Sequence, residues 1–217
     1  MLAILIGLGT WQVQRLQWKT ALLAQIDAAE AAPGVPLPPT PEPFEKVRVQ
    51  GRLLGNLRAT YAAEVHDTRA GPVLGTQLIV PMQRDDADTI LVDLGWIPSD
   101  QRQSVQIPDG TVLIEGYVRP AEHPGLFSAT DNPATHEFYT LDPQAISASL
   151  GLKNLAPFTL IAMGPPPPAG YPDPAQHLPR PPNNHLQYAL TWYGLAAALV
   201  VTFIAWIRKG EDNVRRI

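Results

Sequence analysis

One histidine stands out by its place in the chain. His185 follows Asn183 and Asn184 and precedes a long apolar stretch, in which the twenty residues from Tyr188 to Ile207 carry no charge. A helix of twenty residues rises roughly 30 Å, which matches the hydrocarbon core of a bilayer. Neutral imidazole is a common ligand of haem iron. The position therefore indicates either a metal ligand at the mouth of a membrane helix or a polar group that, with the two asparagines, caps that helix.

The predicted membrane helix has two different faces. The residues that share a face with His185 are Tyr188, Ala189, Trp192, Ala196, Leu199 and Phe203. The opposite face carries Thr191, Gly194, Ala198 and Ala205. Small residues let membrane helices approach closely, and Gly194-x-x-x-Ala198 is the clearest pair. We therefore expect the small-residue face to pack on a first helix, while the imidazole and the aromatic rings face a flat, apolar metal macrocycle.

Other candidate sites in the sequence have weaker patterns. The remaining histidines, His66, His123, His136 and His177, form no pair with metal-ligand spacing. The acidic turn Asp85-Asp86-Ala87-Asp88 lacks the glycine and the closing glutamate of a calcium loop. The chain has no cysteine and no Gly-x-Ser-x-Gly, Walker or dinucleotide motif. The net charge of −4 argues against a nucleic-acid-binding protein.

The N-terminal residues predict a second, shorter membrane segment. Residues 1–11 are apolar but cover only about 16 Å as a helix. No basic residue precedes them and no cleavage site follows, so we expect a membrane helix that lacks its first turns rather than a signal peptide. Trp11, Arg15, Trp18 and Leu22 fall on one helical face, which suits the membrane interface. Pro33-Gly34 should end this helix near Ala32.

Proline divides the rest of the chain. Fifteen of the 24 prolines lie in two blocks, which are typical of stiff linkers. The expected order is a first membrane helix with its extension (1–32), a linker (33–43), a β-rich domain (44–164), a second linker (165–182), a second membrane helix (183–207) and a basic tail (208–217).

The central segment has the alternation and the turns of β-structure. The expected strands are Phe44–Leu54, Asn56–Asp67, Gly71–Pro81, Thr89–Pro98, Thr111–Pro120 and Phe158–Met163. The turn at residues 84–88 should make the third and fourth of these a hairpin. Asp142 as N-cap and Pro143 at the first position predict a short helix to Leu150. The fold class is therefore an antiparallel sheet or small barrel, flanked by two transmembrane helices.

Both ends of the chain resemble one known family, the surfeit-locus family of cytochrome c oxidase assembly factors. The most specific block is Asn183-Asn184-His185-Leu186-Gln187-Tyr188-Ala189, followed by Thr191-Trp192-Tyr193-Gly194. Trp11-Gln12, Arg15 and Trp18-Lys19 match the end of the family's first helix. Gly71-Pro72, Gly75, Pro81 and Gly95-Trp96-Ile97-Pro98 follow in the family's order, although Leu94 replaces the usual arginine before Gly95.

The resemblance implies two membrane helices around a periplasmic domain and a role in maturing the haem-containing subunit of a terminal oxidase. It also implies that haem a binds here, with His185 as the iron ligand. From the helical wheel we expect Tyr188, Trp192 and Phe203 to lie beside the ring. The implied partners are the catalytic subunit of a haem–copper oxidase, a haem a synthase and membrane lipid. The expected location is the bacterial inner membrane. Arg208, Lys209, Arg215 and Arg216 place the C-terminus in the cytoplasm.

Three other functions remain open from the residues. The first is a scaffold that stabilises an oxidase assembly intermediate without holding haem. The second is a membrane-tethered enzyme, which predicts a pocket of convergent polar groups that includes His66, His123 and His136. The third is a domain that binds a soluble peptide or a lipid. Because no nucleophile–base pairing is visible, we expect an assembly factor and not an enzyme.

Overall fold

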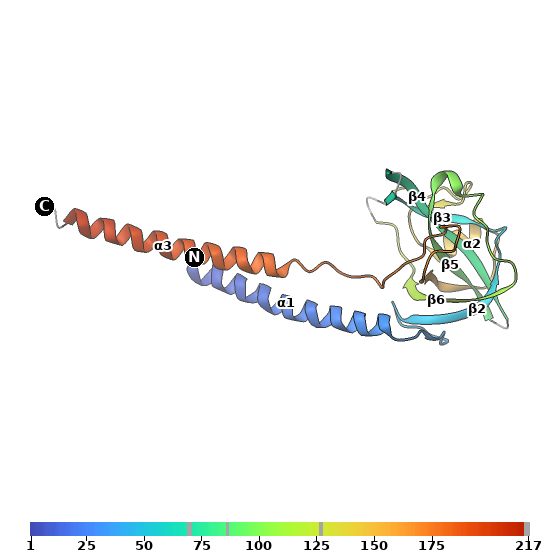
Figure 1. Cartoon of the computed structure of the whole chain (residues 1–217), viewed down its shortest axis with the longest axis horizontal. Coiled ribbons are helices and arrows are strands. Elements are labelled where there is room, and N and C mark those ends of the chain that lie inside the picture. Colours follow the sequence, from blue (N-terminus) through green and yellow to red (C-terminus); the bar gives the residue numbers. More distant parts are fainter. Residues whose placement is uncertain (69–70, 86, 126–127, 215–217) are drawn as a thin grey trace. The chain divides into compact units, whose positions relative to one another are not determined.

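The computed structural model describes residues 1–68, 71–85, 87–125 and 128–214. The chain forms two compact units. The helical unit comprises Met1–Ala29 and Arg180–Ile217, and the barrel unit comprises Glu30–Pro179. Figure 1 labels the three helices and most of the strands, and each unit is described by itself.

The barrel unit contains every strand that the alternation predicts. Its elements are β1 (Val35–Pro36), β2 (Lys46–Leu53), β3 (Ala59–Thr68), β4 (Gly71–Arg84), β5 (Ala87–Pro98), the 3₁₀ turn η1 (Ser99–Gln101), β6 (Thr111–Pro120), β7 (Glu137–Phe138), α2 (Pro143–Ser149) and β8 (Leu155–Ala162). Arg84 pairs with Ala87, which confirms the β4–β5 hairpin; Asp86 lies outside the described residues. Asp142 caps α2 by accepting a hydrogen bond from the Gln144 amide at 2.9 Å, as predicted.

Five strands close into a small barrel. The sheet runs in the order β1-β2-β6-β8-β5-β4-β3-β7, and β2 also pairs with β4 at Arg52↔Gln83 and Leu53↔Met82. The prediction of an antiparallel sheet is wrong for one barrel pair, because β8 runs parallel to β5. Parallel neighbours require a long connection, and the chain from β5 to β8 supplies it through β6, β7 and α2.

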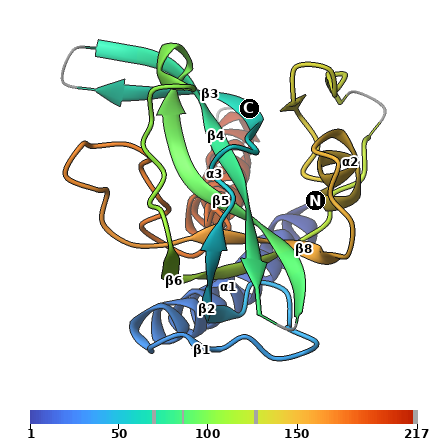
Figure 2. The same ribbon diagram turned by 90° about the vertical axis from the view of Figure 1, so that its right-hand side faces the viewer.

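Apolar side chains from alternate positions fill the barrel. Along β2 the residues alternate between buried and exposed, as a half-buried strand requires. Val47, Val80, Val92 and Leu160 have no exposed surface and lie in the same interior cluster. A second apolar layer forms where α2 packs on β8, outside the barrel (Figure 2). These two layers fix the strand register.

Closure of the barrel depends on Gly51. A Cβ atom added at Gly51 would lie 2.6 Å from both the Gln83 carbonyl oxygen and Met82 Cγ. We expect Gly51→Ala to separate β2 from β4 and to lower the free energy of unfolding by about 1–3 kcal/mol, the usual cost of overpacking. Urea unfolding measures this change. Gly125→Ala is the matched control, because the nearest atom to its added Cβ is 3.7 Å away. Equal effects of the two substitutions would contradict the closure role of Gly51.

The two proline-rich segments are bound to the barrel rather than free. In the first, β1 pairs with β2, and the Leu37 amide donates to the Arg48 carbonyl at 3.2 Å. In the second, Asp173 and Trp96 exchange backbone hydrogen bonds of 2.8 and 2.9 Å. Proline lacks an amide proton, yet the residues between the prolines keep theirs and use them for these bonds. The expected linkers are therefore extended but packed.

Two long helices make up most of the helical unit. Helix α1 spans Leu2–Ala31, so the predicted stop at Pro33-Gly34 is confirmed. Helix α3 spans His185–Val214 and includes the first residues of the expected basic tail. Within the described ranges, one segment, His185–Lys209, is long and apolar enough to cross a membrane, and 6% of its apolar window is buried. This finding is consistent with a membrane protein.

Candidate functional site

The candidate site is built around a hydrogen bond between the two long helices. His185 is the first residue of α3, and its Nδ1 lies 2.8 Å from Oε1 of Gln12 on α1. Gln12 is 9% exposed, although it is polar and lies at the end of the first apolar run. A buried polar group is costly unless it is hydrogen-bonded. The pair therefore satisfies Gln12 and fixes the direction of the imidazole.

This hydrogen bond determines which imidazole nitrogen remains available. An amide oxygen only accepts hydrogen bonds, so Nδ1 of His185 carries the ring proton and donates the hydrogen bond to Gln12 Oε1. In the neutral imidazole the other nitrogen, Nε2, then has a free lone pair. Histidines that bind metals commonly have this arrangement, in which the second ring nitrogen donates to a neighbouring group. His185 therefore has the protonation pattern of a ligand.

The face of α3 that packs on α1 differs from the predicted one. Ala189 and Ala196, on the His185 side, are 3% and 6% exposed, and the Tyr193 hydroxyl lies 3.1 Å from Thr10 Oγ1. A Cβ added at Gly194 would meet no atom within 4 Å. The prediction that the Gly194 face packs on the first helix is therefore wrong. The polar contacts of His185 and Tyr193 select the alanine face, where small side chains also allow close approach.

The aromatic residues predicted beside the imidazole are spread along α3. Tyr188 is 53% exposed, Trp192 is half-buried and Phe203 is 57% exposed. Phe203 stacks with Trp206 at a centroid distance of 6.2 Å. It lies eighteen residues beyond His185, or roughly 27 Å along a helix. The first two rings are thus within about two turns of the imidazole, whereas Phe203 is remote from it.

Gln12, Thr10 and Tyr193 are the contacts that the helical wheel missed. A wheel of α3 alone does not show what lies on a neighbouring helix. The sequence nevertheless contains a signal for Gln12, because it is the first residue with a side-chain amide after the apolar residues 1–11. Such a group needs a buried partner, and His185 is that partner.

Close packing of α1 and α3 depends on Gly9. A Cβ at Gly9 would lie 2.7 Å from the Tyr193 ring. We expect Gly9→Leu to push the helices apart by an ångström or more, since overpacked contacts resist compression. Spin labels on engineered cysteines at Gln14 and Gln187 can measure the separation, because the chain has no native cysteine. Gly194→Leu is the control, and an equal displacement in both variants would refute this packing.

The other histidines have separate partners in the barrel unit. The His66 ring stacks on the Trp96 ring, with the ring centroids 4.5 Å apart. His136 Nδ1 lies 3.2 Å from Ser149 Oγ. His177 Nδ1 lies 2.7 Å from Glu30 Oε1. His123 is exposed. In the described part of the chain, no three His, Cys, Asp or Glu side chains gather in a way that could hold a metal ion. The polar pocket that the enzyme hypothesis requires is therefore not built from His66, His123 and His136 together.

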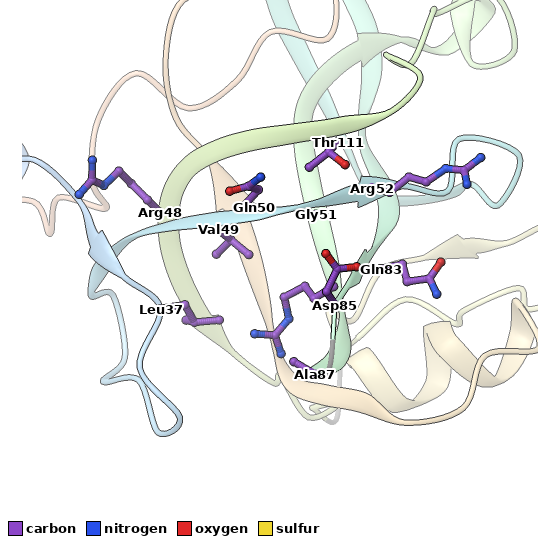
Figure 3. A pocket seen from close by; sticks show the side chains of 11 residues that line it. Leu37, Arg48, Val49, Gln50, Gly51, Arg52, Gln83, Asp85, Ala87 and Thr111 are labelled. Atoms are coloured by element: carbon purple, nitrogen blue, oxygen red, sulfur yellow. The ribbon is translucent and has the colours of Figure 1, made fainter.

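Two cavities formed by described residues of the barrel unit can be compared with the pocket that an enzyme requires. One cavity of about 580 Å³ lies beside the β2–β4 seam. Arg48 and Arg52 are at opposite ends of β2 and point away from each other, while Asp85 lies between them on the facing hairpin (Figure 3). A second cavity of similar size contains His136, but there Arg102 is paired with Glu137. Neither arrangement indicates a particular reaction.

A half-buried polar cluster on the barrel has its hydrogen bonds and its ion pair within the fold. The Arg119 guanidinium pairs with Glu122 and donates to the Tyr61 hydroxyl at 3.1 Å. Glu122 also accepts a hydrogen bond from the Leu141 amide at 3.0 Å. Burial raises the pKa of Tyr61 to about 12, despite the nearby Arg119 charge. Because each of these side chains has a partner within the fold, we assign the cluster a structural role.

Comparison with known proteins gives one consistent family. Residues 1–197 match the SURF1 family. The human protein named Surfeit locus protein 1 is 32% identical over 225 residues, covering 94% of this chain and 73% of the human protein. A SURF1-like protein of Rickettsia felis is 31% identical over 215 residues, covering 95% of this chain and 93% of its own length. A SURF1-like protein of Monosiga brevicollis is 30% identical over 228 residues, covering 97% and 86% respectively.

Proposed function

Because the chain belongs to the SURF1 family, we propose that it assists the assembly of a haem–copper terminal oxidase by binding haem a and passing it to the catalytic subunit. His185 is the iron ligand in this proposal. The observation that carries it is the hydrogen bond from His185 Nδ1 to the buried Gln12, which leaves Nε2 available.

Two further features of the helical unit fit a haem group. Oδ1 of Asn183 is buried and has no hydrogen-bond partner among the described residues, so it can accept a donor from a bound molecule. Tyr188 and Trp192 lie within about two turns of His185 and supply ring surface beside a macrocycle. At roughly 27 Å from the imidazole, Phe203 would contact an apolar substituent or lipid rather than the ring at the iron.

We propose that both long helices cross the bacterial inner membrane. Helix α3 has the length and composition for this role, and α1 pairs with it through Gln12 and Thr10. Arg208 and Lys209 favour a cytoplasmic C-terminus, and two spans then place the domain at residues 44–164 in the periplasm. His185, at the N-terminal end of α3, would lie near the periplasmic face. There it could receive haem a from a synthase and present it to the oxidase subunit.

Co-expression distinguishes this function from a haem-free scaffold. The full chain is produced with a haem a synthase and the oxidase catalytic subunit, and both the chain and the captured subunit are assayed for haem. We expect haem a on the chain and, after capture, on the subunit. A chain that captures the subunit but carries no haem would favour the scaffold and overturn the haem proposal.

A further inference from the structure

We propose that Gln12 is a positioning residue that holds the proton of the neutral His185 ring on Nδ1. Nε2 is then available to iron, and the neutral amide keeps the bound haem releasable. This inference rests on the proposed haem-binding function. It concerns the pair of side chains that face each other across α1 and α3, His185 Nδ1 and Gln12 Oε1, 2.8 Å apart.

The position of Gln12 in the helix interface selects it for this role. Its neighbours on α1, Gln14 and Gln17, are exposed, whereas Gln12 is 91% buried. Gly9, one turn before it, has no side chain and receives the Tyr193 ring. The close contact at Gly9 brings α3 near enough for the glutamine amide to reach the first residue of that helix. Gln12 therefore holds the imidazole from the side opposite to Nε2.

The chemistry of the amide determines how strongly His185 can bind iron. A histidine whose Nδ1 proton is shared with a carboxylate becomes a more basic, stronger ligand. Glutamine offers the same geometry with a neutral oxygen, so it orients the ring without adding negative charge. A carrier needs a ligand that is well oriented but not too strong, because it must give up its haem. The amide satisfies both requirements.

The proton position can be measured before any haem is added. Imidazole ¹⁵N NMR of the full haem-free chain in detergent should show His185 protonated at Nδ1. In Gln12→Leu that preference should be lost, and Gln14→Leu, on the exposed side of the same helix, should behave like the unmodified protein. A proton on Nε2 of His185 in the unmodified chain, or no change in Gln12→Leu, would overturn the inference.

Haem release gives a second, independent readout. Haem a is transferred from each loaded protein to apomyoglobin, and the release rate is compared. We expect Gln12→Glu to keep the ring orientation and to release haem at least tenfold more slowly, and Gln12→Leu to bind at least tenfold more weakly. Release from Gln12→Glu at the unmodified rate would refute the tuning role. If the unmodified chain takes up no haem, the proposed function fails, while the NMR result still decides the role of Gln12.

Discussion

The His185→Ala protein, produced in cells that make haem a, is expected to purify without its haem absorbance. Alanine removes the imidazole whose Nε2 is free to bind iron, while Gln12 loses the partner that satisfies it. Residues that only hydrogen-bond to a metal ligand change metal affinity by about 10–100-fold, so loss of the ligand itself should weaken binding by at least about 100-fold. Optical spectra of the purified chain, normalised to protein, measure the effect.

Two controls separate ligand loss from general damage. His123→Ala removes an exposed imidazole of the barrel unit and should leave haem content unchanged. His185→Gln keeps a polar side chain that can hydrogen-bond to Gln12 but supplies no imidazole, so it should fold normally and still lack haem. Full haem content in His185→Gln would show that another side chain binds the iron.

The second large effect concerns Asp93, a carboxyl group buried on the outer side of the barrel. Asp93 is 3% exposed, and its Oδ1 accepts a hydrogen bond from the Gly95 amide at 2.9 Å. Burial raises its pKa from 3.8 to about 7, although the Gly95 hydrogen bond and the Arg119 charge act in the opposite direction. Thr159, on the same face of the neighbouring strand, has a buried hydroxyl without a partner in the described ranges. The folded chain therefore favours the protonated, neutral form of the Asp93 carboxyl.

The sign of the pH dependence follows from this raised pKa. Below pH 3.8 the carboxyl is protonated in both the folded and the unfolded chain, so it adds no pH dependence. Between pH 3.8 and about 7 the unfolded chain loses the proton while the folded chain retains it, so the free energy of unfolding falls as pH rises. Each pKa unit corresponds to about 1.4 kcal/mol, so the fall approaches roughly 4 kcal/mol by pH 7.

We expect Asp93→Asn to remove this dependence. Asparagine can still accept the Gly95 hydrogen bond and carries no charge at any of these pH values, so the variant should be more stable than the unmodified chain at pH 8. Urea unfolding at pH 4, 6 and 8 measures the difference. Asp100→Asn, at an exposed position, is the control. An unchanged slope of stability against pH in Asp93→Asn would show that Asp93 is ionised in the folded protein.

The strands could be predicted because the signals for a strand lie within the strand itself and in the turns beside it. The alternation in β2 and the apolar runs of β4 and β5 reflect one buried face, and turn residues separate them. The predicted N-cap at Asp142 was equally local, since it needs an oxygen near the next amides. For the same reason, the end of α1 could be predicted from Pro33-Gly34.

Features that depend on distant residues could not be predicted in the same way. The parallel pairing of β8 with β5 is set by the path of about sixty intervening residues. The packing face of α3 is chosen by Gln12 and Thr10, which lie about 180 residues earlier in the chain. The helical wheel has small residues on both faces of α3, at Gly194 and at Ala189. It contains no residue of α1, so it could not show which of the two faces has partners there. His185 itself was found from its position and its family block.

The ratio of haem to protein in the purified chain shows directly whether this protein holds haem, as we propose. The full-length protein is co-expressed with a haem a synthase, purified in detergent, and its extracted haem is quantified against protein. We expect close to one haem a per chain, lost in His185→Gln and retained in His123→Ala. A ratio near zero in the unmodified protein, with the synthase shown to be active, would contradict it.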